Sequence, residues 1–362
     1  MVDHLLVEPV SPESKGMALC GASYSGHLQM AQLLIERGAD VNAQGEQYGV
    51  AYGPPLDCAS SQGHEPVVRL LIEKGADVNA QRRFEGNALY SAAADGHELA
   101  VRTLIEAGAD VNAQGGHVGN ALAVASIMGH KLLVKLLIDK GADVNAQGGH
   151  WGNALQAASG IGHEPVVRLL IEEGANINAQ GGEYGNALQA ASYMGNEPVV
   201  RLLIEEGADI NAQGGKYGNA LQAASSKGHT LLVQLLIDKG ADVSAQGGKY
   251  GNALQAASSK GHKLLVQLLI DRGADVNVQG GYWGNALQAV SYGGHEQLVK
   301  LLIEKGVDVN AEGGEYGNAL KAASYWGHNY IVEILIRAGA HENVEHHTIG
   351  VNNGEDTSVL QD

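Results

Sequence analysis

A repeat of 33 residues constrains the fold of this chain more than any other feature. The segment from Gln213 to Ala245 recurs in the next 33 residues, Gln246 to Val278, at 29 of 33 positions. A period of this length is typical of a solenoid, in which each unit buries its apolar face against its neighbours. The glycine that opens each GAD-like turn marks the units, with a four-residue insertion between the first two: Gly38, Gly75, Gly108, Gly141, Gly174, Gly207, Gly240, Gly273, Gly306 and Gly339.

Charge and cysteine content narrow the classes of function. The formal net charge of −17 argues against direct binding to nucleic acid, which needs Lys and Arg to neutralise phosphates, and against an anionic membrane surface. Cys20 and Cys58 occupy different positions of their units, which predicts neither a disulfide framework nor a metal cluster and favours a reducing compartment. With no signal peptide or membrane-length apolar run visible, we expect a soluble chain in the cytoplasm, the nucleus or both.

Each unit contains signals for two short helices. Asn219 is a favourable N-cap, and Gln222 stands where a capping-box partner reaches back to it. Gly228 is expected to end this first helix as a C′ glycine. A second helix is predicted over about 231–239, where the leucines follow i, i+3, i+4 spacing, and Gly240 ends it. A glycine-rich turn then projects before the next unit.

This order of turn, helix, Gly-His, helix and GADVNA resembles the ankyrin repeat, over about 16–344. The family's TPLH opening stands here as NALQ in most units, and its hairpin aspartate is replaced by Gly-Gly, a variant similar to long arrays in fungal proteins. The resemblance implies an all-α ankyrin-repeat solenoid of about ten helix-turn-helix units with projecting hairpin turns. Residues 1–15 are predicted to be an N-terminal cap segment with a turn at Ser11-Pro12, and 345–362 an acidic disordered tail.

Residues that could carry chemistry recur with the unit, which indicates a structural role. Nine of the fifteen histidines belong to the Gly-His turn and are expected to bond a neighbouring loop. The GAD aspartates are turn residues about 10 Å apart, too far for paired acid–base work. Neither a phosphate-binding GK[ST] loop nor a supported nucleophile elbow is present. We therefore expect no enzyme, no cofactor and no metal site.

Positions that differ between near-identical units indicate which residues bind a partner. Two pairs vary between near-identical units, one in the hairpin before Gly-Asn and one just before Gly-His. Aromatic residues there are the usual anchors of binding, and four lysines form a local positive patch in an acidic protein. The predicted partner-binding residues are Trp151, Tyr184, Tyr193, Met194, Lys216, Tyr217, Lys227, Lys249, Tyr250, Lys260, Tyr282, Trp283, Tyr292, Tyr325 and Trp326.

Two interpretations of these residues stay open. The recurring rings Tyr184, Tyr217 and Tyr250 are expected to stack from hairpin to hairpin, whereas the irregular Tyr193, Met194, Tyr325 and Trp326 are expected to contact a partner. The four lysines serve a partner or are inherited copies. The predicted function is that of a monomeric scaffold or adaptor that binds a partner protein through its concave face. The alternative is a nuclear transcriptional co-regulator that acts through a bound transcription factor.

Overall fold

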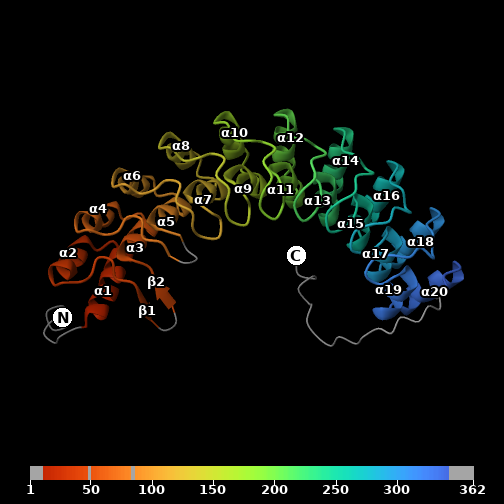
Figure 1. Cartoon of the computed structure of the whole chain (residues 1–362), viewed down its shortest axis with the longest axis horizontal. Coiled ribbons are helices and arrows are strands. Elements are labelled where there is room, and N and C mark those ends of the chain that lie inside the picture. Colours follow the sequence, from red (N-terminus) through yellow and green to blue (C-terminus); the bar gives the residue numbers. More distant parts are fainter. Residues whose placement is uncertain (1–10, 48–49, 83–85, 342–362) are drawn as a thin grey trace.

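The computed structural model describes residues 11–47, 50–82 and 86–341, which form a curved stack of helix pairs (Figure 1). The first helix of each pair lies on the concave side of the arc. These inner helices, one for each of ten units, are α1 (Pro12–Tyr24), α3 (Pro55–Ser61), α5 (Ala88–Ala94), α7 (Ala121–Ile127), α9 (Ala154–Ile161), α11 (Ala187–Met194), α13 (Ala220–Lys227), α15 (Ala253–Ser259), α17 (Ala286–Tyr292) and α19 (Ala319–Tyr325).

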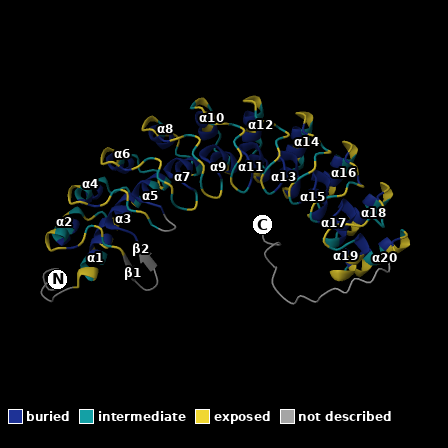
Figure 2. Ribbon diagram, in the orientation of Figure 1, coloured by how far each residue is buried: buried dark blue, intermediate teal, exposed yellow. Residues whose placement is uncertain are grey.

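The second helix of each pair covers the convex side. These outer helices are α2 (Leu28–Glu36), α4 (Glu65–Glu73), α6 (Glu98–Glu106), α8 (Lys131–Asp139), α10 (Glu164–Glu172), α12 (Glu197–Glu205), α14 (Thr230–Asp238), α16 (Lys263–Asp271), α18 (Glu296–Glu304) and α20 (Asn329–Arg337). Figure 2 shows burial concentrated in the inner layer and exposure along the outer edge. One apolar core runs from Leu19 to Leu335 through every unit. The predicted all-α solenoid of about ten units is therefore confirmed.

Helix α13 begins and ends at the predicted residues. The side chain of Asn219 accepts from the backbone N–H of Gln222 at 2.8 Å, and the backbone N–H of Asn219 donates to Gln222 Oε1 at 2.9 Å. Gly228 ends α13 in the left-handed region, at φ 77°. A Cβ there would lie 2.6 Å from the His262 ring of the next unit, so both conformation and packing require glycine.

The glutamine that completes this cap also binds the next unit. Gln222 Nε2 donates to the carbonyl oxygens of Ala245 and Gly251, both at 3.1 Å. We call this series of bonds the glutamine ladder; its members are Gln156, Gln189, Gln222, Gln255 and Gln288. The first four units carry other residues at this position, namely Cys20, Asp57, Tyr90 and Ala123. The ladder therefore joins units five to ten only.

The Gly-His histidines serve the stack, as predicted. The Nε2 atom of His229 lies 3.0 Å from the carbonyl oxygen of Tyr193, in the preceding unit. His64, His97, His130 and His328 make the equivalent bond. Where asparagine replaces histidine, Asn196 Nδ2 donates to the Ser159 and Gly160 carbonyls instead. An amide donor therefore replaces the imidazole in this hydrogen bond between neighbouring units.

The GADVNA turns form a further link between units. Asp242 Oδ1 accepts from the backbone N–H of Ser244, which confirms that the GAD aspartate is a turn residue. Asn211 bridges to the next unit, because its Nδ2 donates to the Gly240 carbonyl at 3.1 Å and its Oδ1 accepts from the Asp242 N–H at 2.8 Å.

The first two units differ in part from expectation. Helix α1 begins at Pro12 with Ser11 as its N-cap, inside the predicted cap segment 1–15, so Ser11-Pro12 starts a helix where we expected a turn. The four-residue insertion lengthens one hairpin into strands β1 (Gly45–Gln47) and β2 (Val50–Tyr52). Inner helices α1 and α3 still pack directly, so the stack is uninterrupted. The rest of the cap segment, 1–10, and the predicted tail 345–362 lie outside the described residues.

Candidate protein-binding face

The hairpin tips form a continuous hydrogen-bonded edge along the concave side. From His150 onward, one residue of each hairpin donates its backbone N–H to the carbonyl oxygen of the residue 33 positions earlier, as Lys216 does to Glu183 and Lys249 does to Lys216, both at 2.9 Å. The same bond joins units four to ten, through His117, His150, Glu183, Lys216, Lys249, Tyr282 and Glu315. Side chains that project from this edge are therefore held at a fixed spacing.

Aromatic rings stack beneath that edge. The rings of Tyr184 and Tyr217 are 6.2 Å apart between centroids with planes 17° apart, and Tyr217 stacks on Tyr250 with similar geometry. Trp151 stacks on Tyr184 at 5.1 Å, and a second run pairs Trp283 with Tyr316 at 6.5 Å. The expected hairpin-to-hairpin stack is confirmed. Tyr217 and Tyr250 are at most 4% exposed, and their burial raises the pKa of both phenols.

Tyr193 lies within this stack. Its ring centroid is 4.4 Å from that of Tyr217 and 5.1 Å from that of Tyr184, and the side chain is 6% exposed. Tyr292 packs against Trp283 in the same way, with centroids 4.1 Å apart. The sequence predicts Tyr193 as a direct partner contact. In the structure its ring fills the space between two hairpins and also lines a pocket with Lys227 and Lys260.

The four lysines differ in how they are held. Lys216 Nζ lies 2.7 Å from Glu183 Oε1, so its charge is partly balanced within the array. Lys249 Nζ lies 5.7 Å from the ring centroid of Tyr250. Lys227 Nζ is 4.5 Å above the Tyr193 ring, within cation–π range. Lys227 and Lys260 are exposed, and no ion pair to either lysine occurs among the residues that the structure describes.

Lys227 and Lys260 line one shallow pocket. It has a volume of about 260 Å³ and is completed by Tyr193, Tyr250, Ser226 and His262. Two ammonium groups and a hydroxyl beside aromatic walls suit an anionic side chain. Within the described ranges, no group of three His, Cys, Asp or Glu side chains could hold a metal ion. No described helix has the length and apolarity needed to cross a membrane.

Comparison with known proteins agrees with this geometry. A family model described as ankyrin repeats (3 copies) matches residues 1–82, 56–148, 148–214, 213–280 and 254–346. The chain belongs to the ankyrin repeat family. Among solved structures, the crystal structure of the human ASB11 ankyrin repeat domain is 27% identical, with a TM-score of 0.53 over 61% of this chain and 98% of that one. No curated protein matches the chain.

At the carboxyl end of the inner helices, the ankyrin array presents a row of exposed side chains at one repeat position. We call this the variable row; its members, one per unit from the fourth to the eighth, are Met128, Ile161, Met194, Lys227 and Lys260. The three apolar members are 50%, 44% and 39% exposed, which is unusual for large apolar side chains in successive units. Met128 and Ile161 are absent from the predicted set, although their 33-residue spacing from Met194 was a usable signal.

The last unit of the ankyrin array carries an aromatic pair, in which Trp326 stands at the repeat position of the variable row but beyond Gly293. Tyr325 is 73% exposed and Trp326 is 44% exposed, which leaves both side chains accessible. Their rings meet edge to face with centroids 5.6 Å apart, and Trp326 also contacts Tyr292. Tyr282 is partly buried against Trp283. The predicted set therefore divides into stacked rings, a row at the helix ends and an exposed terminal pair.

Proposed function

We propose that this protein is a scaffold or adaptor that binds an extended segment of a partner protein along the variable row. Ankyrin repeats are general protein–protein interaction modules, which supports the class of function. The observation that carries the proposal is the order of the row: three exposed apolar side chains in units four to six, then two lysines in units seven and eight.

The spacing of the row suggests the form of the partner segment. Adjacent units stack at the helix–helix distance, roughly 10 Å. A polyproline II strand advances about 3.1 Å per residue with three residues per turn, so every third side chain faces the same way after roughly 9 Å. A partner would therefore present apolar side chains at three successive third positions and carboxylates at the next two. The buried ring stack keeps the row rigid, which lowers the ordering cost of binding.

A peptide-display selection on the purified full chain tests this proposal. Selected peptides are expected to share apolar residues at third-residue spacing followed by Asp or Glu. We expect K227E with K260E to weaken the best peptide on the order of tenfold, about 1.4 kcal/mol, and Met194→Asp to weaken it as well. The matched control is K239E with K305E, which reverses two exposed charges next to outer helices.

The peptide affinities of these variants distinguish the possible binding sites. Loss of binding in the first double variant and not in the control supports the variable row. Equal affinity in all variants, or selected peptides without acidic residues, contradicts it. If only the double variant Tyr325→Ser, Trp326→Ser loses peptide binding, the variable row is not the binding site and the terminal pair is.

A further inference from the structure

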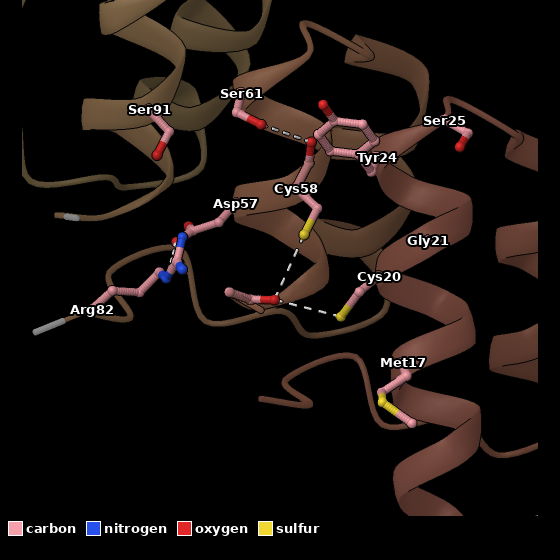
Figure 3. Close-up of a pocket in the computed structure, with 11 residues that line it drawn as sticks. Met17, Cys20, Gly21, Tyr24, Ser25, Asp57, Cys58, Ser61, Arg82 and Ser91 are labelled. Carbon is pink, nitrogen blue, oxygen red and sulfur yellow. Dashed lines mark hydrogen bonds and ion pairs between the residues drawn. The ribbon is translucent and has the colours of Figure 1, made fainter. Parts of the chain in front are cut away.

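A second site lies at the other end of the array, between the first three units. A cavity of about 450 Å³ lies beside α1 and α3 and is lined by Met17, Cys20, Gly53, Cys58 and Arg82, among others (Figure 3). It is independent of the variable row, which begins in the fourth unit. The proposed partner-binding function does not involve the residues that line this cavity.

The two cysteine thiols converge in this cavity. Cys20 Sγ donates to the carbonyl oxygen of Gly53 at 3.4 Å, and Cys58 Sγ donates to the same oxygen at 3.6 Å. Figure 3 shows both sulfurs pointing at that oxygen from facing helices. Both cysteines are free thiols in this structure, with Cys20 buried and Cys58 partly exposed.

The repeat shows how far this arrangement departs from the rest of the array. Cys20 occupies the position of Gln222, and its bond to Gly53 corresponds to the bond from Gln222 to Gly251. Cys58 occupies the position of Ala223, whose methyl group is fully buried. A thiol is a weaker donor than a primary amide, so for hydrogen bonding alone these units would gain more from glutamine.

Charge in the cavity favours a thiolate at Cys58. Arg82 lies beside it, with Nε 3.9 Å from the carboxylate of Asp57. When Cys58 is a thiolate, the Cys20 S–H can donate to it in place of the Gly53 carbonyl, which lowers the pKa of Cys58, and Arg82 lowers that pKa further; burial and the Asp57 charge act in the opposite direction. The same hydrogen bond raises the pKa of Cys20. Cys58 is also the more exposed thiol of the pair. It is therefore the thiol that a peroxide reaches first, and its thiolate is the reactive form.

We propose that Cys20 and Cys58 form a modification site at which a peroxide oxidises the two thiols to one disulfide. The Cys58 thiolate attacks a peroxide oxygen, the O–O bond breaks, and hydroxide leaves and takes a proton as water. Cys58 is now a sulfenic acid. The Cys20 sulfur attacks the Cys58 sulfur, and the hydroxyl leaves with the Cys20 proton as a second water. Each hydrogen peroxide is reduced to two waters as two thiols are oxidised.

The product would join inner helices α1 and α3 in the part of the array that lacks the glutamine ladder. It would also remove both thiol donors from the Gly53 carbonyl. Oxidation would thus exchange two weak hydrogen bonds for one covalent link between units one and two. We expect slower amide exchange in α1 and α3 after oxidation.

The test uses the full chain and hydrogen peroxide in modest molar excess. We expect the loss of both thiols and a tryptic species that links residues 16–37 to 38–69 and separates on reduction with dithiothreitol. Cys58 should react with peroxide several-fold faster in the native chain than in the urea-denatured chain. The substitution Arg82→Gln should slow the reaction of native Cys58. In Cys20→Ser, dimedone should trap a sulfenic acid on Cys58, whereas in Cys58→Ser the buried Cys20 should stay reduced.

Three results would overturn the proposal: native thiols no faster than denatured ones, linkage only between different chains, or equal peroxide reactivity of the two single variants. Cys20→Ala, with circular dichroism to verify folding, repeats the trapping experiment if the serine variant fails to fold.

Discussion

Gln222 donates to the carbonyl oxygen of Gly251 in the next hairpin, at 3.1 Å, while its own side-chain oxygen caps α13. One buried amide thus starts a helix and joins two units. Five units contain this residue, and the first four do not. The array therefore has a more strongly linked C-terminal part, which also carries most of the aromatic stack.

Replacing Gln222 with Leu should destabilise the array by roughly 2–4 kcal/mol, since about three hydrogen bonds worth on the order of 1 kcal/mol each are lost and buried carbonyls are left unpaired. Urea denaturation measures the change in the free energy of unfolding. Gln234→Leu is the control, because that amide bonds only Asp238 at the surface and its loss should cost under about 0.5 kcal/mol. Equal losses in the free energy of unfolding for the two variants would show that the glutamine ladder does not stabilise the array.

Amide hydrogen exchange should be faster in α5 and α7 than in α13 and α15. The two pairs lie at comparable distances from the ends of the stack, but only the second belongs to the glutamine ladder. Local opening follows the number of bonds that hold a unit to its neighbours. Mass spectrometry of exchanged peptides provides the measurement. Similar protection in both pairs would contradict this account of the ladder.

Alanine substitutions at two glycines of positive φ distinguish the cost of backbone strain from the cost of disturbed packing. Gly228 has φ 77°, and a Cβ there meets the His262 ring; Gly240 has φ 100°, with nothing within 4 Å. Alanine at Gly240 should cost about 1 kcal/mol from strain alone, and alanine at Gly228 at least about 1 kcal/mol more from displacing the ring. Thermal and urea denaturation of the two variants compare these costs. A reversed order would refute the packing argument.

Acid should destabilise the array through His262 and His295. Burial, the largest cause, lowers the pKa of both imidazoles below the ordinary histidine value of 6.5. The unfolded chain then binds more protons, so the stability they contribute is complete above about pH 6.5 and is lost as pH falls through the lower folded pKa. The double variant His262→Asn, His295→Asn copies the natural Asn196 joint. Its stability should fall less than that of the wild type between about pH 7 and pH 5.5. An unchanged pH dependence would exclude these histidines as the source.

Most of the fold could be predicted because the repeat makes local signals redundant. The Asn caps, the glycine that ends each inner helix and the histidine joint each occur many times at one spacing, so a single unit accounts for the others. The start of α1 was missed by four residues, because Ser11-Pro12 is equally typical of a turn and of a helix N-terminus.

The candidate site was predicted less completely. The sequence could show which positions vary but not which way each side chain faces. Tyr193 and Met194 are adjacent, yet one is 6% exposed and the other 39%, because successive residues of a helix point about 100° apart and only Tyr193 meets the neighbouring hairpins.

The sequence by itself thus determined the number and order of the helices, because each unit carries its own caps and apolar stripe. Only the tertiary structure decided which variable residues form a surface and which two cysteines meet. Cys20 and Cys58 lie 38 residues apart, with the one insertion between them, and they converge because the units stack through a bond to Gly53 that no pattern within a single unit reveals.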